Sequence, residues 1–274
     1  MNTDEADTHF AAWMRENLDV AASYFNLEIT ARPVFGWRLR SISARVNGSQ
    51  GSRWLRVVSQ ESQWAQGNPW TGTLDANDIV DVPKPRVLNV LEWADGRQQR
   101  AEVMTLMPGQ ACSPTDALRS PLTLPGTWWS DLKNSLESLA GTSTDRTHSN
   151  QQEITQRIQD RFGRAVDTAV SRWETVHGDL HWSNLMHPPC GLLDWELWGR
   201  GPAGTDAATL YCYSLLVPAA AKKVHEMFAD ALDAPTGRVA QLYVIARMLR
   251  RVDDGDYSDL AEPLTRHAHG LLVS

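Results

Sequence analysis

The chain has 274 residues, 42% of them hydrophobic, which is enough for a sizeable core in one large domain or two lobes. Its formal net charge is −7 and it has no basic stripe, which argues against a nucleic-acid partner. No apolar run approaches the roughly 18 residues of a membrane span, so we expect no membrane partner. The three scattered cysteines lack metal-ligand spacing and indicate free thiols in a reducing compartment.

The N-terminal half begins with an acidic segment that does not resemble a secretory signal, so we expect a cytoplasmic protein. Residues 4–20 place apolar side chains at helical spacing after this acidic start, which predicts an amphipathic helix. Residues 28–58 have the pattern of strands, interrupted near Gly36, which could mark a loop, a bulge or a turn. Arg56 lies in the last of these strands, and strand alternation leaves open whether it faces a ligand or solvent.

The middle of the chain changes from strands to helices. Residues 59–81 are broken by Gly and Pro, so the pattern predicts no clean helix there. Strands are predicted over 87–93 and 100–107, and Met107 is followed by a Pro-Gly pair that is typical of a turn. Beyond it, apolar stripes at helical spacing predict a helical C-terminal half.

The most informative stretch is residues 177–196, which read H-G-D-L-H-W-S-N-L-M-H-P-P-C-G-L-L-D-W-E. A short strand-like segment precedes it. Its second half predicts two short strands joined by a turn that the two prolines enforce. Such a hairpin would bring Asn184 and Asp194 to the same place, close to Asp179 in the preceding loop.

These three side chains are the groups that phosphoryl transfer needs. One carboxylate must orient the acceptor hydroxyl and take its proton, a role that Asp179 fits. An amide oxygen and a second carboxylate must hold Mg²⁺ on the ATP phosphates, and Asn184 and Asp194 fit because Mg²⁺ prefers hard oxygen ligands. The Asp-x-x-x-x-Asn spacing equals that of the protein-kinase catalytic loop. The alternative is a hairpin whose polar residues only cap turns.

The H-G-D-L-H-W-S-N segment followed by L-L-D-W-E resembles the signature of the aminoglycoside phosphotransferase and choline kinase-like family. The resemblance implies an α+β, two-lobed, protein-kinase-like fold, with a strand-rich nucleotide-binding lobe over 1–107 and a helical catalytic lobe over 108–274. It also implies ATP and Mg²⁺ as cofactors, with GTP left open. The acceptor would be a hydroxyl of a small molecule such as an aminoglycoside, choline, an amino alcohol, a sugar or another antibiotic.

The same resemblance assigns roles to individual residues. It makes Asp179 catalytic and Asn184 and Asp194 metal ligands. It places Gly36 over the ATP phosphates, Arg56 where the family has a phosphate-gripping Lys, and Met107 at the hinge that meets adenine. Four further residues would support the catalytic loop, namely His177, His181, Glu196 and Asp206. Asp206 equally suits a helix N-cap or a first-turn acid.

The sequence departs from the family at the nucleotide side. Arg56 keeps the positive charge of the expected Lys but has a larger, forked head. The family's helix Glu, which pairs with that Lys, has no clear counterpart between Glu61 and Glu92, and Asp75 and Asp78 are the substitutes. These departures favour the alternative of a catalytically idle, nucleotide-binding regulatory member. The intact Asp–Asn–Asp set favours an active enzyme.

The acceptor's charge is predicted from a group of acids near the catalytic stretch and the C-terminus. They are Glu196, Asp253, Asp254, Asp256 and Asp259. Together with tryptophan faces they would attract a cationic acceptor. Arginines on the preceding segment, Arg247, Arg250 and Arg251, could instead neutralise them internally. We therefore expect an aminated acceptor only slightly ahead of a neutral one, bound by a monomer or weak homodimer.

Overall fold

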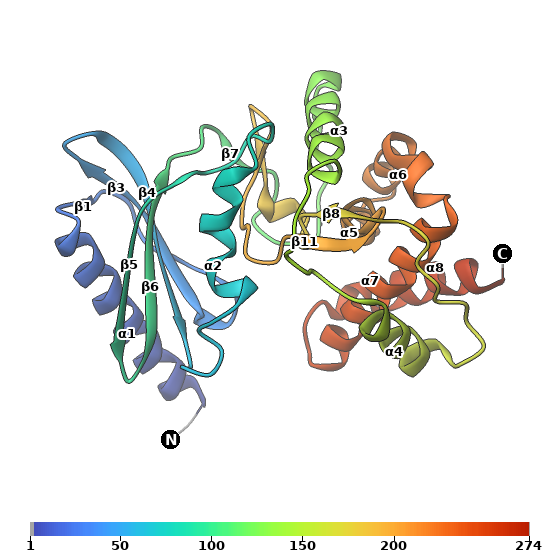
Figure 1. The fold of residues 1–274 in the computed structure, drawn as a ribbon, viewed down its shortest axis with the longest axis horizontal. Coiled ribbons are helices and arrows are strands. Elements are labelled where there is room, and N and C mark those ends of the chain that lie inside the picture. Colours follow the sequence, from blue (N-terminus) through green and yellow to red (C-terminus); the bar gives the residue numbers. More distant parts are fainter. Residues whose placement is uncertain (1–2, 274) are drawn as a thin grey trace. The chain divides into compact units, whose positions relative to one another are not determined.

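The computed structural model describes residues 3–273 and divides into two compact units (Figure 1). The first unit runs to Asn77 and resumes over Pro85–Met107, and the second covers Asp78–Lys84 and resumes at Pro108. The first is rich in strands and the second in helices, and residues 78–84 belong to the helical unit although they precede two strands of the other. Within the described residues, no helix is both long and apolar enough to cross a membrane.

The strand-rich unit is an antiparallel sheet in the order β1-β3-β4-β6-β5, with β2 paired to β3. Its strands are β1 (Glu28–Ile29), β2 (Val34–Phe35), β3 (Ser41–Gly48), β4 (Gly51–Gln60), β5 (Val87–Asp95) and β6 (Arg97–Thr105). Its helices are α1 (Thr3–Tyr24) and α2 (Asn68–Asp75).

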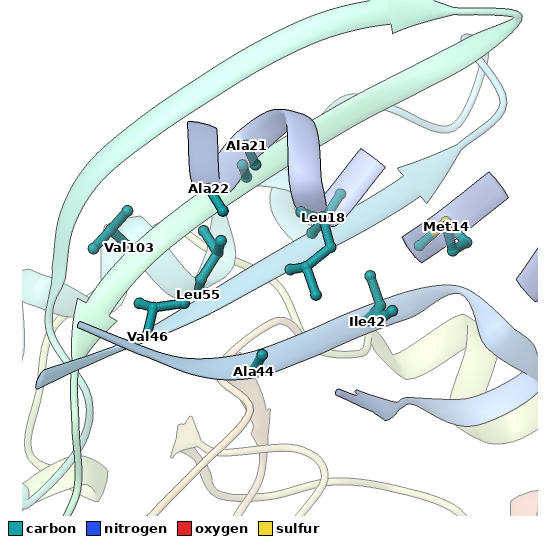
Figure 2. Close-up of a cluster of buried hydrophobic side chains, with 11 residues drawn as sticks. Met14, Leu18, Ala21, Ala22, Ile42, Ala44, Val46, Leu55 and Val103 are labelled. Carbon is teal, nitrogen blue, oxygen red and sulfur yellow. The ribbon is translucent and has the colours of Figure 1, made fainter. Parts of the chain in front are cut away.

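One face of this sheet packs against α1, and the apolar residues of the two form the core of the unit (Figure 2). The predicted amphipathic helix is thus confirmed, and it is longer than expected. Its buried side chains include Met14 and Leu18, which meet alternate strand residues such as Ile42 and Leu55. Because side chains alternate along a strand, the intervening residues, among them Arg56, lie on the opposite face.

The segment before β5 contains a helix that the sequence pattern missed. The expectation of no clean helix over residues 59–81 is wrong for α2, which spans Asn68–Asp75. Its proline, Pro69, stands in the first turn, where a backbone N–H has no partner within the helix, so the residue begins the helix rather than breaking it.

The helical unit is built from six α-helices among the described residues. They are α3 (Gly126–Ala140), α4 (Gln151–Phe162), α5 (Thr205–Ser214), α6 (Pro218–Leu232), α7 (Pro235–Asp253) and α8 (Ala261–Val273). Helix α5 is buried on nearly every side and packs against α6 and α7, so it forms the centre of this unit.

Short strands in the helical unit frame the predicted catalytic stretch. They are β7 (Gln110–Ala111), β8 (Trp173–Val176), β9 (Leu185–His187), β10 (Gly191–Leu192) and β11 (Gly199–Pro202). One small sheet has the order β10-β9-β7, and β11 pairs with β8 in another. The loop between β8 and β9 and the loop between β10 and β11 are therefore each anchored at both ends by paired strands.

Candidate active site

The predicted hairpin after the catalytic loop is confirmed. Leu185 pairs with Leu192, and Met186 pairs with Gly191, around a turn that contains a cis peptide bond between Pro188 and Pro189. At the open end, the N–H of Leu193 donates to the carbonyl oxygen of Asn184 at 2.8 Å. Asn184 and Asp194 therefore leave the hairpin at the same end, as the sequence pattern predicted.

Asp194 has a backbone conformation that turns its carboxylate outward. Its φ is 59°, in the left-handed region that few residues other than Gly, Asn and Asp adopt. The next residue, Trp195, is buried, and its indole N–H donates to the carbonyl oxygen of Leu192 at 3.0 Å. The left-handed residue thus lets the chain send the tryptophan into the core while the carboxylate of Asp194 stays exposed. Conformations of this kind are found most often at functional sites.

Asp179 is held in the loop between β8 and β9 by its neighbours. Its backbone N–H donates to Nδ1 of His177 at 3.4 Å, and its carbonyl oxygen accepts from Nδ2 of Asn184 at 3.0 Å. Its Oδ2 lies 3.5 Å from Nε2 of His181. Burial raises the pKa of Asp179, but the hydrogen bond and charge of His181, together with the charge of Arg247, hold that pKa well below the usual range. Asp179 is therefore an ionised hydrogen-bond acceptor at neutral pH.

His181 is the titratable neighbour closest to the carboxylate of Asp179 in this loop. Burial lowers the pKa of His181, but the hydrogen bond and charge of Asp179, with the charges of Asp116 and Asp194, raise it above its ordinary value. Asp116, which the sequence did not single out, accepts a hydrogen bond from Ser183 Oγ at 3.0 Å and another from the hydroxyl of Tyr257. His181 therefore stands between two carboxylates, and their negative charges favour its protonated form.

The start of the catalytic loop is fixed by Asp206, in the first turn of α5. Its two carboxylate oxygens accept the backbone N–H groups of His177, at 2.7 Å, and of Gly178, at 2.9 Å. Burial raises the pKa of Asp206 to about 7, against the opposing effect of these two donors. His177 is fully buried, which lowers its pKa to about 4, so the neutral ring donates from Nε2 to the carbonyl oxygen of Leu193 at 2.8 Å. This bond ties the catalytic loop to the hairpin.

Gly178 has no room for a side chain. Its φ is +82°, and a Cβ at this position would lie 2.3 Å from Nδ1 of His148 and 2.7 Å from the carbonyl oxygen of Leu197. The ring of His148 occupies this space because its Nδ1 hydrogen-bonds the same carbonyl at 2.9 Å. The His-Gly-Asp sequence thus lets the catalytic loop pack closely against the segment that follows Asp194.

A polar loop before α4 holds that segment, a role that the sequence pattern did not indicate. Arg146 is buried, its Nε donates to the carbonyl oxygen of Trp198 at 3.3 Å, and its NH2 donates to that of Glu196 at 3.4 Å. Glu196, which was predicted to support the loop, thus contacts Arg146 through its backbone carbonyl oxygen. Thr147 forms a β-bridge with Arg200 of β11, which sets the position of the loop. A sequence pattern could not indicate these contacts, because the partners lie about fifty positions apart in the sequence.

The residues expected to meet the nucleotide lie in the strand-rich unit. Gly36 closes a tight turn, where its N–H donates to the carbonyl oxygen of Ser41 at 2.9 Å. Met107 follows β6 and ends the unit. Arg56 lies opposite Glu102 in the β4–β6 pairing, with 3.9 Å between its NH1 and Oε2 of Glu102. Glu102, on the neighbouring strand, is therefore an acidic neighbour of Arg56.

Glu102 belongs to a charge cluster on the sheet face opposite α1. Its side chain is 2% exposed, and its Oε1 accepts from Nε of Arg100 at 2.9 Å. Arg100 also forms an ion pair with Glu92, which in turn accepts from the indole N–H of Trp70 on α2 at 3.0 Å. The cluster thus links α2 to the strand that carries Arg56. Asp75, one of the substitutes considered from the sequence, accepts from the hydroxyl of Thr71 at 2.6 Å.

The residues at the open end of the hairpin fit a magnesium ion. Because Nδ2 of Asn184 donates to the carbonyl of Asp179, the amide oxygen is the atom that can ligate a cation. With the exposed carboxylate of Asp194, this gives two hard oxygen ligands, and Mg²⁺ commonly takes one or two such ligands plus water and substrate phosphates. Among residues 3–273, no group of three or more His, Cys, Asp or Glu could hold a metal unaided.

Comparison with known proteins gives a family and a fold that agree with the two units and the site described above. The sequence pattern of the phosphotransferase enzyme family matches residues 68–243. None of the curated proteins matches the chain in sequence. The architecture is that of the two-lobed, protein-kinase-like phosphotransferases, with a strand-rich and a helical part. The chain belongs to the phosphotransferase enzyme family.

Three solved structures illustrate the fold. A thermostable mutant of aminoglycoside phosphotransferase APH(4)-Ia, in a ternary complex with ADP and hygromycin B, has a TM-score of 0.63 at 14% identity, over 93% of this chain and 97% of that one. Amicoumacin kinase hAmiN, in complex with AMP-PNP and Ca²⁺, has a TM-score of 0.57 at 12% identity, over 94% and 92%. The GDP and kanamycin complex of APH(2")-IIia has a TM-score of 0.51 at 14% identity, over 90% and 93%.

The charge cluster around Arg56 generates a prediction about stability. Glu102→Gln leaves Arg56 and Arg100 facing an uncharged amide in a buried position. Breaking a buried ion pair by removing one partner is expected to lower the free energy of unfolding by about 3–5 kcal/mol. The matched control is Glu92→Gln, because Glu92 is 48% exposed and its loss should matter by about 1 kcal/mol or less. Urea titration followed by tryptophan fluorescence gives both values, and equal losses would contradict the special role of Glu102.

Proposed function

We propose that this phosphotransferase moves the γ-phosphoryl group of ATP to a hydroxyl group of a small molecule, with Mg²⁺ as cofactor. The observation that carries the proposal is the placement of Asp179. Its ionised carboxylate is fixed in a hydrogen-bonded loop, and the same loop joins the hairpin end that bears Asn184 and Asp194. The three buried free thiols support a reducing, cytoplasmic environment for it.

In the proposed reaction, the acceptor hydroxyl donates a hydrogen bond to the carboxylate of Asp179. The depressed pKa of Asp179 makes it a weak base, so the proton would leave the hydroxyl late, when the bond to phosphorus is already forming. This suits the loose transition state of phosphoryl transfer, in which positioning matters more than strong base catalysis. His181 and Asp206 would act through Asp179 and its loop, as positioning residues.

The metal would be held at the open end of the hairpin by the amide oxygen of Asn184 and the carboxylate of Asp194. When bound, Mg²⁺ would neutralise the negative charge of the phosphates. The left-handed backbone at Asp194 supports this role, because it presents the carboxylate at the surface while Trp195 anchors the chain below it.

On the nucleotide side, we assign phosphate binding to Arg56, the phosphate-covering turn to Gly36 and the adenine contact to Met107. A guanidinium can bind phosphate oxygens through two parallel N–H donors, so Arg can take the place of the family's Lys. Glu102 would orient Arg56, as the helix acid does elsewhere in the family. The acidic neighbour supports an active enzyme over an idle, nucleotide-binding member, because Arg56 has a charge partner that can orient it.

The direct test of Asp179 is its replacement by Asn, which keeps the shape and removes the charge. Turnover should fall by about 10²–10⁴-fold, the usual contribution of a general base. Affinity for Mg-ATP should be nearly unchanged, because Asp179 contacts the acceptor and not the nucleotide. ADP release over a panel of hydroxylated compounds measures turnover, and calorimetry measures affinity. Near-normal turnover in Asp179→Asn would rule out this role, and a wild type that binds Mg-ATP without any turnover would establish the idle alternative.

The metal assignment predicts a difference between two affinities. Asp194→Ala removes one charged ligand, so it should weaken binding of Mg-ATP more than binding of metal-free ATP. The control is Asp230→Ala, which removes an exposed acid from α6 and should change neither affinity. Nucleotide titrations with Mg²⁺ and with a chelator measure both. An equal loss in the two titrations would exclude Asp194 from the metal site.

A further inference from the structure

The helical unit contains a small open hollow with Asp179 in its wall. The rest of its wall comes mainly from one face of α7, where Val244, Arg247, Met248 and Arg251 follow one another at helical spacing. Thr209 and Tyr213 of α5 complete the lining. One acidic and two basic side chains thus face the same space, which is where an acceptor beside Asp179 would lie.

The two arginines differ in how their charge is balanced. Nε of Arg251 lies 3.3 Å from Oδ2 of Asp256, so an ion pair compensates its charge. The contacts of Arg247 are with Nε2 of His148, at 3.4 Å, and with the ring of Tyr243, at 5.7 Å. Within residues 3–273, no carboxylate oxygen lies within 4.0 Å of a guanidinium nitrogen of Arg247. A half-buried cation without an ion pair therefore faces the hollow.

His148 does not compensate this charge. Burial, followed by the charge of Arg247, lowers the pKa of His148 to about 4, so the ring is neutral at physiological pH. Its Nδ1 hydrogen bond to Leu197 leaves Nε2 as the acceptor for one N–H of Arg247. Since a guanidinium has five N–H donors, others stay available for a ligand.

The acids that the sequence offered as an attraction for a cationic acceptor are largely neutralised. Asp253 pairs with Arg161 at 2.8 Å, and Asp259 pairs with Arg119 at 2.8 Å. Asp256 is the partner of Arg251. Only the pair of Asp256 with Arg251 is the internal neutralisation that the sequence left open, and the other two partners, Arg119 and Arg161, come from distant segments. Arg247 is then the cation of the hollow for which the described residues provide no ion pair.

We propose, on the basis of the phosphotransfer assigned above, that the acceptor is a small hydroxy acid whose carboxylate binds Arg247 while its hydroxyl meets Asp179. A planar guanidinium and a carboxylate fit each other through two parallel hydrogen bonds. Asp179 orients the acceptor in two ways. Its carboxylate accepts a hydrogen bond from the hydroxyl group, and its negative charge repels the carboxylate of the acceptor. Val244 and Met248, on the same face of α7, contact the carbon skeleton.

The test compares hydroxy acids with their primary amides, which have the same shape without the charge. Suitable probes are glycerate, malate, gluconate and quinate, each paired with its amide, and ethanolamine as a cationic acceptor. ADP release should give a kcat/KM for the preferred acid about 10–100-fold above that for its amide, the range expected for a charge-assisted hydrogen bond. Arg247→Gln should remove this preference mainly by raising KM for the acid, and Arg247→Lys should restore part of it.

The matched control is Arg250→Gln, which removes an exposed arginine from the same helix and should leave the preference intact. A wild-type preference for the amides or for ethanolamine would overturn the proposal. So would an Arg247→Gln protein that loses activity equally on acid and amide, because Arg247 would then only support Asp179.

Calorimetry with the acids in the absence of nucleotide separates the two proposals. No binding of any acid overturns the carboxylate site, whereas binding that depends on Arg247 without any turnover upholds the site and overturns the phosphotransfer.

Discussion

Asp206 accepts the backbone N–H groups of two consecutive residues, His177 and Gly178, from a buried position at the start of α5. This interaction joins the central helix of the helical unit to the loop that carries Asp179. The loop then reaches the hairpin through the ring of His177, which donates to the carbonyl of Leu193. Removal of Asp206 would therefore leave two buried backbone donors unpaired and release the loop at its first residue.

The same framework sets the charge of the site. Asp179 is kept ionised by a positive neighbour on either side, His181 in its own loop and Arg247 on α7. Because its basicity is low, the role proposed for it is to orient a hydroxyl and accept its proton late, which suits phosphoryl transfer. Arg247 then has two effects. Its charge lowers the pKa of Asp179, and in the proposal above its guanidinium group binds the carboxylate of the acceptor.

The sequence allowed prediction of those features that depend on a local pattern of residues. The hairpin, its turn and the placing of Asn184 beside Asp194 follow from residues within one short stretch. Glu102, Asp116, Arg146 and Arg247 could not be predicted, because each acts on a residue brought near by strand register or helix packing. The helix α2 was missed for a different reason, since a proline that breaks a helix interior is favourable in a first turn. The ion pairs of Asp253 and Asp259 could not be predicted either, because their arginine partners come from distant segments.

The central claim is that Asp179 directs a phosphoryl group from ATP to a hydroxyl of a small molecule. Phosphorus–proton correlation NMR of the product formed with the best acceptor of the panel tests it most directly. The account predicts a phosphate ester on the carbon that bore the hydroxyl group, formed by the wild type and absent, over the same time, with Asp179→Asn. Release of inorganic phosphate alone, or equal ester formation by both proteins, would contradict it.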